Sequence, residues 1–318
     1  MMRRTLGFFA GFGLAFAAFG AGSDIQLVST QKITMPGQVS YGLEKWRHGH
    51  LISVDKLAAD SATFVVSDAE DSGIEFSFSL PNTTRMWIDD FDLDARGAVV
   101  FCGQSYSFDG RLASFIGIRE PAADQITVIR TYPYRPKVIS VAPDGTVWTS
   151  GIEAEQTAGS WVVNQNADIV RHYDRSGRLI ASAIPEGQVT YQPRTVSGFL
   201  VATKSCVGWY SPDSGKGNVY VEMSPDLRSV TQYPGIPDPH GYGRVLGFTL
   251  SESGDAYLTW EDQARRATYH LDRTLKQWIE IPVPQATKDL IPTLKGEDEG
   301  LLVFRDGYDL NFVKPVSR

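Results

Sequence analysis

Short hydrophobic segments alternate with turn residues along this chain, and many of them end in a proline. The prolines that close successive segments lie 45, 52, 52, 52 and 47 residues apart, at Pro36, Pro81, Pro133, Pro185, Pro237 and Pro284. A regular period of roughly 50 residues, with several short strands in each period, is the sequence signature of a β-propeller. The pattern therefore predicts an all-β fold built from repeated blades.

Each period contains two predicted hairpins, which give four antiparallel strands that we label A to D. In the clearest period, an apolar strand at 138–142 leads through Asp144-Gly145 into a strand at 146–151, and a second hairpin covers 169–182. The repeats predict six four-stranded blades, at about 39–81, 87–133, 137–185, 192–237, 244–284 and 290–316.

The last predicted blade has room for only three strands before the chain ends. The segment 25–36 contains one strand and a terminal proline, with no other strand before it. We therefore expect this N-terminal strand to complete the last blade and to close the ring, which would remove two exposed sheet edges. An open sandwich of similar strands is the alternative, but the regular spacing disfavours it.

Two motifs carry a resemblance to a known class of propeller. Ala142-Pro-Asp-Gly-Thr-Val-Trp148 and Tyr173-Asp-Arg-Ser-Gly-Arg178 resemble the repeats of NHL-type and related six-bladed propellers, which include streptogramin lyases and two-component-regulator sensor domains. The resemblance implies a six-bladed architecture for nearly the whole chain after its first 23 residues. The other blades keep the hydrophobic pattern without the consensus, so no catalytic residues are carried over from these families.

The first 23 residues are typical of an export signal. Arg3 and Arg4 precede an apolar run at 6–20, and small residues follow at 20–23. The run is short and glycine-rich for a membrane-spanning helix, which needs about 20 apolar residues, although an uncleaved anchor is the alternative. We therefore expect a signal peptide at 1–23 and a propeller at 24–318. The expected location is periplasmic or extracellular, without stable membrane insertion.

The net charge and the cysteine content limit which functions and which kinds of fold stabilisation are expected. The 318 residues carry a net charge of −7, which disfavours sequence-independent binding to nucleic acid because phosphates need a basic surface. The only cysteines are Cys102 and Cys206, predicted near B-strand ends in non-adjacent blades. A disulfide would require the segment 204–217 to reach inward, so we expect the hydrophobic core to hold the fold together. We expect a monomer.

The predicted topology distinguishes two faces of the ring. The D–A crossings and B–C loops share one face, here called the loop face, and the A–B and C–D turns share the opposite turn face. Long B–C loops are predicted at 103–113, 151–167 and 204–217, the last containing Trp209-Tyr210. Because loops on a rigid framework often carry binding sites, the loop face is the predicted functional face.

Cationic residues lie next to aromatic residues in the predicted D–A crossings, at Arg85, Arg135, Lys137, Arg194 and Arg244. This combination suits carboxylate, phosphate or sugar-acid ligands, because arginine forms bidentate hydrogen bonds and stacks on rings. The candidate ligand-binding residues are Trp87, Arg135, Lys137, Arg194, His240, Tyr242 and Arg244. In the alternative interpretation the cations pair with acids such as Asp89 and Asp289 and join neighbouring blades.

Few residues offer catalytic or metal chemistry. His240 is the candidate general acid or base, because imidazole titrates near neutral pH; a loop histidine that bonds its own backbone is the alternative. His48-Gly-His50 is predicted to form an exposed turn rather than a metal site. Asp90, Asp92 and Asp94 alternate along a strand, and we expect them to line a water-filled channel, with a calcium site as the alternative.

These patterns favour an exported, non-catalytic propeller that binds a small anionic ligand or a protein partner on the loop face. A lyase or hydrolase with its active site at the mouth of the central channel is one alternative. A protein-docking scaffold without a small-molecule site is another. No cofactor is expected, calcium being the one exception left open.

Overall fold

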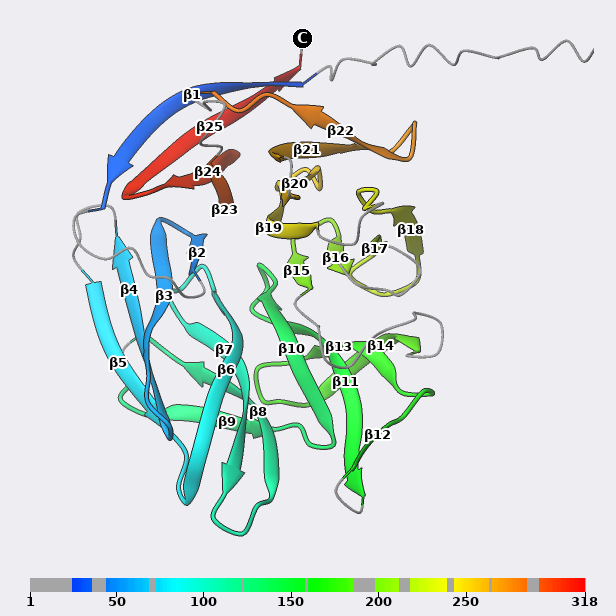
Figure 1. Ribbon diagram of the computed structural model, residues 1–318. Coiled ribbons are helices and arrows are strands. Elements are labelled where there is room, and N and C mark those ends of the chain that lie inside the picture. Colours follow the sequence, from blue (N-terminus) through cyan, green and yellow to red (C-terminus); the bar gives the residue numbers. More distant parts are fainter. Residues whose placement is uncertain are drawn as a thin grey trace, which may run out of the picture.

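The computed structural model describes residues 25–35, 44–68, 73–121, 123–157, 160–185, 198–211, 218–238, 243–262, 265–284 and 292–317. Over these ranges the chain forms six antiparallel sheets that succeed one another around a ring (Figure 1). The predicted six-bladed β-propeller is therefore confirmed. The expected signal peptide at 1–23 lies outside the described residues. Within them, no helix is long and apolar enough to cross a membrane.

The first three blades follow one another in sequence. Blade 1 contains β2 (Glu44–Arg47), β3 (His50–Leu57), β4 (Ser61–Asp68) and β5 (Gly73–Ser79). Blade 2 contains β6 (Thr83–Leu93), β7 (Val99–Ser107), β8 (Leu112–Arg119) and β9 (Ile126–Arg130). Blade 3 contains β10 (Tyr134–Val141), β11 (Val147–Thr157), β13 (Asp168–Tyr173) and β14 (Leu179–Pro185), and the short β12 (Ser160–Val163) pairs with β11.

The other three blades complete the ring. Blade 4 contains β15 (Phe199–Ala202), β16 (Val207–Ser211), β17 (Val219–Met223) and β18 (Val230–Pro234). Blade 5 contains β19 (Arg244–Leu250), β20 (Ala256–Glu261), β21 (Arg266–Asp272) and β22 (Gln277–Ile281). Blade 6 contains β23 (Thr293–Asp298), β24 (Leu301–Asp306) and β25 (Asp309–Ser317), followed in space by β1 (Ile25–Thr34).

Strand β1 closes the ring as the sequence predicted. It runs antiparallel to β25, with Ile25 opposite Ser317 and Thr34 opposite Asp309 (Figure 1). Leu27 is 3% exposed and packs with Phe304 and Val313 of the same blade. The N-terminal strand therefore supplies both backbone pairing and apolar contact to the last blade.

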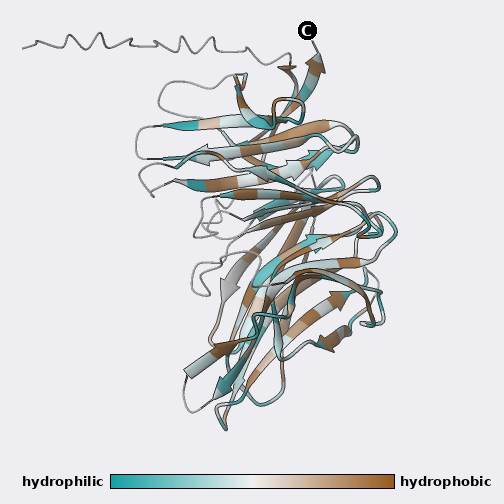
Figure 2. Ribbon diagram, turned by 90° about the vertical axis from the view of Figure 1, so that its right-hand side faces the viewer, coloured by the Kyte–Doolittle hydropathy of each residue, from teal (hydrophilic) through white to brown (hydrophobic). Residues whose placement is uncertain are grey.

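The hydrophobic core lies between the blades. Phe64 and Phe78 of blade 1 pack against Phe101 of blade 2, with ring centroids 4.7 and 4.8 Å apart. Trp46 of β2 packs edge-on against Phe312 of β25, with centroids 5.3 Å apart. Figure 2 views the blades from the side and shows hydrophobic segments running along the strands. Alternate strand residues therefore fill the spaces between sheets, as in sandwich packing.

The first strands of the six blades, β2, β6, β10, β15, β19 and β23, contact one another and surround the central channel. The channel-side edge of each of these strands has no neighbouring strand in its own sheet, and side chains of neighbouring blades accept hydrogen bonds from some of its amides. Asp90 accepts from the Ile139 amide and Asp92 from the Val141 amide, both at 2.9 Å. Buried amides need such acceptors, so these carboxylates fix blade 2 against blade 3.

The prediction of long B–C loops is largely wrong. Residues 103–107 continue β7, so the turn between β7 and β8 is short, and residues 151–163 include the β11–β12 hairpin. Trp209 and Tyr210 are fully buried in β16 instead of lying in a loop. Polar and aromatic residues here extend strands, because cross-strand pairing and packing between blades override the local loop composition.

The cysteines also lie elsewhere than predicted. Cys102 is in the middle of β7, and Cys206 precedes β16 at the A–B turn, where its carbonyl accepts a hydrogen bond from the Thr203 amide. Both are buried free thiols, and burial raises the pKa of each. The fold is therefore held without a disulfide.

Candidate functional site

A cavity of about 230 Å³ opens at the loop-face mouth of the central channel. Its lining residues belong to the first strands of the blades or directly precede them, and all six blades contribute side chains or backbone to it. Its charged side chains are Glu44, Lys45, Arg47, Asp89, Asp90, Lys137 and Lys295. The predicted functional face therefore contains a concave site at the channel axis.

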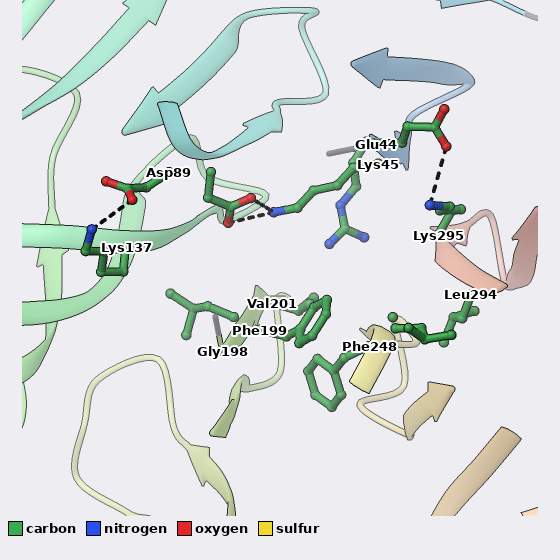
Figure 3. A pocket seen from close by; sticks show the side chains of 15 residues that line it. Glu44, Lys45, Asp89, Lys137, Gly198, Phe199, Val201, Phe248, Leu294 and Lys295 are labelled. Atoms are coloured by element: carbon green, nitrogen blue, oxygen red, sulfur yellow. Dashed lines mark hydrogen bonds and ion pairs between the residues drawn. The ribbon is translucent and has the colours of Figure 1, made fainter. Parts of the chain in front are cut away.

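Three lysines from three blades face this cavity, and each is paired with one carboxylate. The ammonium of Lys137 lies 2.8 Å from Asp89 Oδ1, and that of Lys45 lies 2.8 Å from Asp90. Lys295 Nζ is 3.4 Å from Glu44 Oε2. Figure 3 shows Lys137 and Lys295 on opposite sides of the cavity with Lys45 between them. The lysines are thus held in place by these carboxylates, and Lys45 Nζ also lies 3.5 Å from the Ile139 carbonyl oxygen.

Burial dominates the electrostatics of two of these carboxylates. The pKa of Asp89 is raised because burial outweighs the attraction of Lys137 and the hydrogen bonds from Lys137 and Gln104. The pKa of Asp90 is likewise raised, because burial outweighs the attraction of Lys45. Both carboxylates therefore lose their negative charge at a higher pH than an exposed aspartate would.

A hydrogen-bond network extends from the cavity toward blade 3. The Gln104 amide nitrogen donates to Asp89 at 2.7 Å, and its oxygen accepts from Arg135 Nε at 2.9 Å. The Arg135 guanidinium lies 4.4 Å from the ring centroid of Trp161 in the β11–β12 hairpin. Arg135 therefore stands beside the cavity and supports the Asp89–Lys137 pair through Gln104, which is fully buried.

Cations outnumber carboxylates around this mouth. The cluster contains Lys45, Arg47, Lys137 and Lys295, together with Arg135 and with Arg305, which lies 3.9 Å from Glu44. Its carboxylates are Glu44, Asp89, Asp90 and Asp92. Among the residues that line the cavity itself, four cations stand against three carboxylates, Glu44, Asp89 and Asp90, in a chain of net charge −7.

The other predicted ligand-binding residues have different places. Trp87 lies on β6, half-buried, with Tyr106 at 5.7 Å between ring centroids and the Arg85 guanidinium 5.6 Å from its ring. Arg244 is exposed at the start of β19 and pairs with Glu261 within blade 5. Arg194, His240 and Tyr242 lie outside the described residues. Of the predicted set, the structure brings Lys137 and Arg135 together around Asp89.

Several residues of the cavity were missed by the sequence analysis. Lys45 and Lys295 lie one or two positions after the start of a first strand, as does Val201 of blade 4. Phe199 and Phe248 line the side opposite the lysines (Figure 3). A comparison of equivalent early positions in every strand A could have found them, because propeller symmetry directs these positions to the channel.

A second cavity, of about 320 Å³, lies at the turn-face mouth, where its lining includes His48, Lys204, Glu252 and Glu297. Arg47 and Val201 line both cavities. The predicted turn at His48-Gly49 is confirmed between β2 and β3, where His50 Nδ1 lies 2.7 Å from the His48 carbonyl oxygen. Arg47, whose Nε is 3.1 Å from Asp92 Oδ1, therefore stands between the two ends of the channel.

Of the three alternating aspartates, Asp90 lines the loop-face cavity and Asp92 the turn-face cavity, as expected of channel residues, whereas Asp94 lines neither. Asp90, Asp92 and Asp94 are 6%, 1% and 4% exposed. The first two pair with Lys45 and Arg47, whereas Asp94 lies at the β6–β7 turn and accepts from Arg175 Nη1 at 2.6 Å. Among the described residues, no three His, Cys, Asp or Glu side chains are grouped as metal ligands would be. The aspartates instead join blades through ion pairs.

No family model matches the chain, and no curated protein is significantly similar to it in sequence. Several solved structures are similar to it at low identity. A luciferin-regenerating enzyme is 15% identical, with a TM-score of 0.48 over 89% of this chain and 95% of that one. The calcium-binding protein regucalcin from Agrobacterium tumefaciens strain C58 is 14% identical, with a TM-score of 0.47 over 91% and 95%.

A cobalt-substituted Synechocystis ACO is 11% identical, with a TM-score of 0.45 over 73% of this chain. This chain spans only 57% of the length of that protein. The proteins in these comparisons differ in function, and each likeness concerns the fold alone. The activity is therefore argued from the site.

Proposed function

We propose that this protein is an exported, non-catalytic propeller that binds a small anionic ligand at the loop-face mouth of its channel. The observation that carries the proposal is the set of three lysines, Lys45, Lys137 and Lys295, which reach one cavity from three blades. Ammonium groups recognise carboxylate and phosphate oxygens by charge-assisted hydrogen bonds. Their side chains are only 15–20% exposed, so a bound anion would be shielded from competing salt.

Other parts of the proposal rest on the sequence. Export is supported by the signal-like segment 1–23, and the NHL-like character by the two motifs in blade 3. We propose a monomer that binds neither nucleic acid nor, stably, a membrane. A cofactor is not part of the proposal, since calcium at Asp90 or Asp92 would have to compete with Lys45 and Arg47.

Lys295→Met is expected to weaken anion binding at least about tenfold, because it removes a charge-assisted hydrogen bond from the cavity. The variant should fold, since Glu44 keeps Arg305 as a neighbour. The measurement is a thermal-shift screen of the full chain against organic acids and phosphorylated metabolites, in which binding raises Tm by mass action.

The control for this experiment is Lys314→Met, which makes the same change in charge and shape at an exposed position on β25. The control should show the wild-type shift with every anion that binds. An equal loss in both variants would mean that only overall charge matters, and no shift with any anion in the wild type would remove the basis of the proposal.

Anion affinity is expected to rise as the pH falls from 7 toward the ordinary aspartate pKa of 3.8. The raised pKa values of Asp89 and Asp90 mean that these carboxylates begin to protonate above their ordinary value of 3.8, and protonation frees Lys137 and Lys45 for the ligand. The measurement is calorimetric titration with benzenesulfonate, which stays ionised over this range. Asp89→Asn should bind more tightly at pH 7 with a weaker pH dependence. An affinity at pH 4 that is no higher than at pH 7 would contradict this explanation.

A further inference from the structure

The wall opposite the lysines is apolar. It is formed by Phe199 and Val201 of β15, Leu246 and Phe248 of β19, and Leu294 of β23. In Figure 3 the rings of Phe199 and Phe248 lie next to each other, across the cavity from Lys45. The cavity is thus divided between charged side chains of blades 1, 2, 3 and 6 and hydrophobic side chains of blades 4, 5 and 6.

This wall is held rigidly but is not sealed. Phe199 packs against the cluster that contains Tyr210 and Phe248, which fixes the orientation of its ring. Phe199 and Leu246 are nevertheless only half-buried, so part of the wall still contacts solvent in the cavity. Covering such a surface with an apolar group is favourable by about 25 cal/mol per Å². A ligand with an apolar portion would therefore gain from this side of the cavity.

Close approach of two blades shapes the same side. Gly247 of β19 lines the cavity, and a Cβ atom at this position would lie 1.8 Å from the carbonyl oxygen of Leu294. The strand register also shifts between Val245 and Gly247. The absence of a side chain lets β19 meet β23 directly, so the apolar wall is continuous from blade 5 to blade 6.

On the basis of the proposed anion site, we infer that the ligand is an amphipathic monocarboxylate with a compact aromatic or branched apolar body. The carboxylate lies on the lysine side of the cavity, at Lys45 between Lys137 and Lys295, and the body lies against Phe199 and Phe248 on the opposite side. The volume of about 230 Å³ is below the roughly 300–1,000 Å³ of sites for drug-sized ligands. The cavity therefore suits an arylacetate-sized acid better than a nucleotide or a long acyl chain.

Calorimetric titration of the full chain with three probes tests this inference. Phenylacetate has both parts, acetate lacks the apolar body, and phenylacetamide lacks the charge. We expect phenylacetate to bind at least about tenfold more tightly than either of the other two. Phe199→Ala should lower the affinity for phenylacetate severalfold and leave that for acetate unchanged. Phe108→Ala, at an 80% exposed position outside this cavity, should bind all three probes like the wild type.

The possible outcomes distinguish the proposed anion site from the inferred amphipathic ligand. If acetate binds as tightly as phenylacetate, the anion site stands and the amphipathic ligand is overturned. If phenylacetamide binds as tightly as phenylacetate, the lysines do not recognise charge and the proposed function fails. If none of the three binds while phosphate or a sugar acid does, the apolar wall is not part of the site and the inference is again overturned.

Discussion

Asp92→Ala is expected to lower the free energy of unfolding by about 3–5 kcal/mol, the typical cost of removing one partner from a buried ion pair. Asp92 is 1% exposed and accepts from Arg47 Nε, from Ser140 Oγ at 3.0 Å and from the Val141 amide at 2.9 Å. Alanine leaves the Arg47 guanidinium and a buried amide without this acceptor. Since these contacts join blades 1, 2 and 3, the loss weakens two blade interfaces at once.

Chemical denaturation at pH 7 measures this effect, and its pH dependence checks the cause. Burial tends to raise the pKa of Asp92, but Arg47, Lys45 and the amides of Val141 and Leu93 outweigh it and lower the pKa overall. The stability from Asp92 is therefore fully present above the ordinary value of 3.8 and is lost as the pH falls through the lowered pKa. The difference in free energy of unfolding between wild type and Asp92→Ala should therefore become smaller at acidic pH.

Asp109→Ala is the control for this experiment, because Asp109 forms an exposed pair with Arg111 at the β7–β8 turn. Its denaturation curve should coincide with that of the wild type. If the free energy of unfolding of Asp92→Ala is close to that of Asp109→Ala, the channel ion pairs do not hold the blades together.

Leu27→Asp is expected to destabilise the fold by about 4 kcal/mol or more. The substitution removes a buried leucine and places a carboxylate among Leu302, Phe304 and Val313, and both changes are costly. Because Leu27 belongs to β1, the loss falls on the strand that completes blade 6 and closes the ring. Thermal unfolding followed by circular dichroism should show a large fall in Tm or no cooperative transition.

The neighbouring residue provides a matched control. Val28 is on the same strand, directly after Leu27, but points to the other face of the sheet and is 43% exposed. Val28→Asp introduces the same carboxylate and should change Tm little. Equal effects at the two positions would show that β1 does not pack as described, and a native Tm for Leu27→Asp would show that closure contributes little to stability.

The fold could be predicted from the sequence because its signals are local and repeated. Each hairpin carries its own turn chemistry, as in Asp144-Gly145, where Gly145 has a positive φ of 83°. Prolines near the blade ends then give the repeat period. The closure by β1 followed from counting strands in the last period, and the structure confirms it.

The loops and the site could be predicted only in part, because they depend on contacts between blades. Trp209 and Tyr210 were expected in a loop, yet packing against blades 3 and 5 buries them in β16. Lys137 was selected because an aromatic residue lies near it in sequence. Lys45 and Lys295 have no comparable signal in the sequence around them, and only the closed arrangement of the six blades brings them to the same cavity. Their pairing with Asp90 and Glu44 is likewise a contact that no single segment specifies.

A crystal structure of the full chain soaked with para-bromophenylacetate tests the central claim most directly, because bromine can be located by its anomalous scattering. The account predicts a bromine peak beside Phe199 and Phe248 in the loop-face cavity, with carboxylate density on the lysine side, at Lys45 between Lys137 and Lys295. Bromine found only in the turn-face cavity beside His48, or only at the outer surface, would contradict an anion site at this mouth.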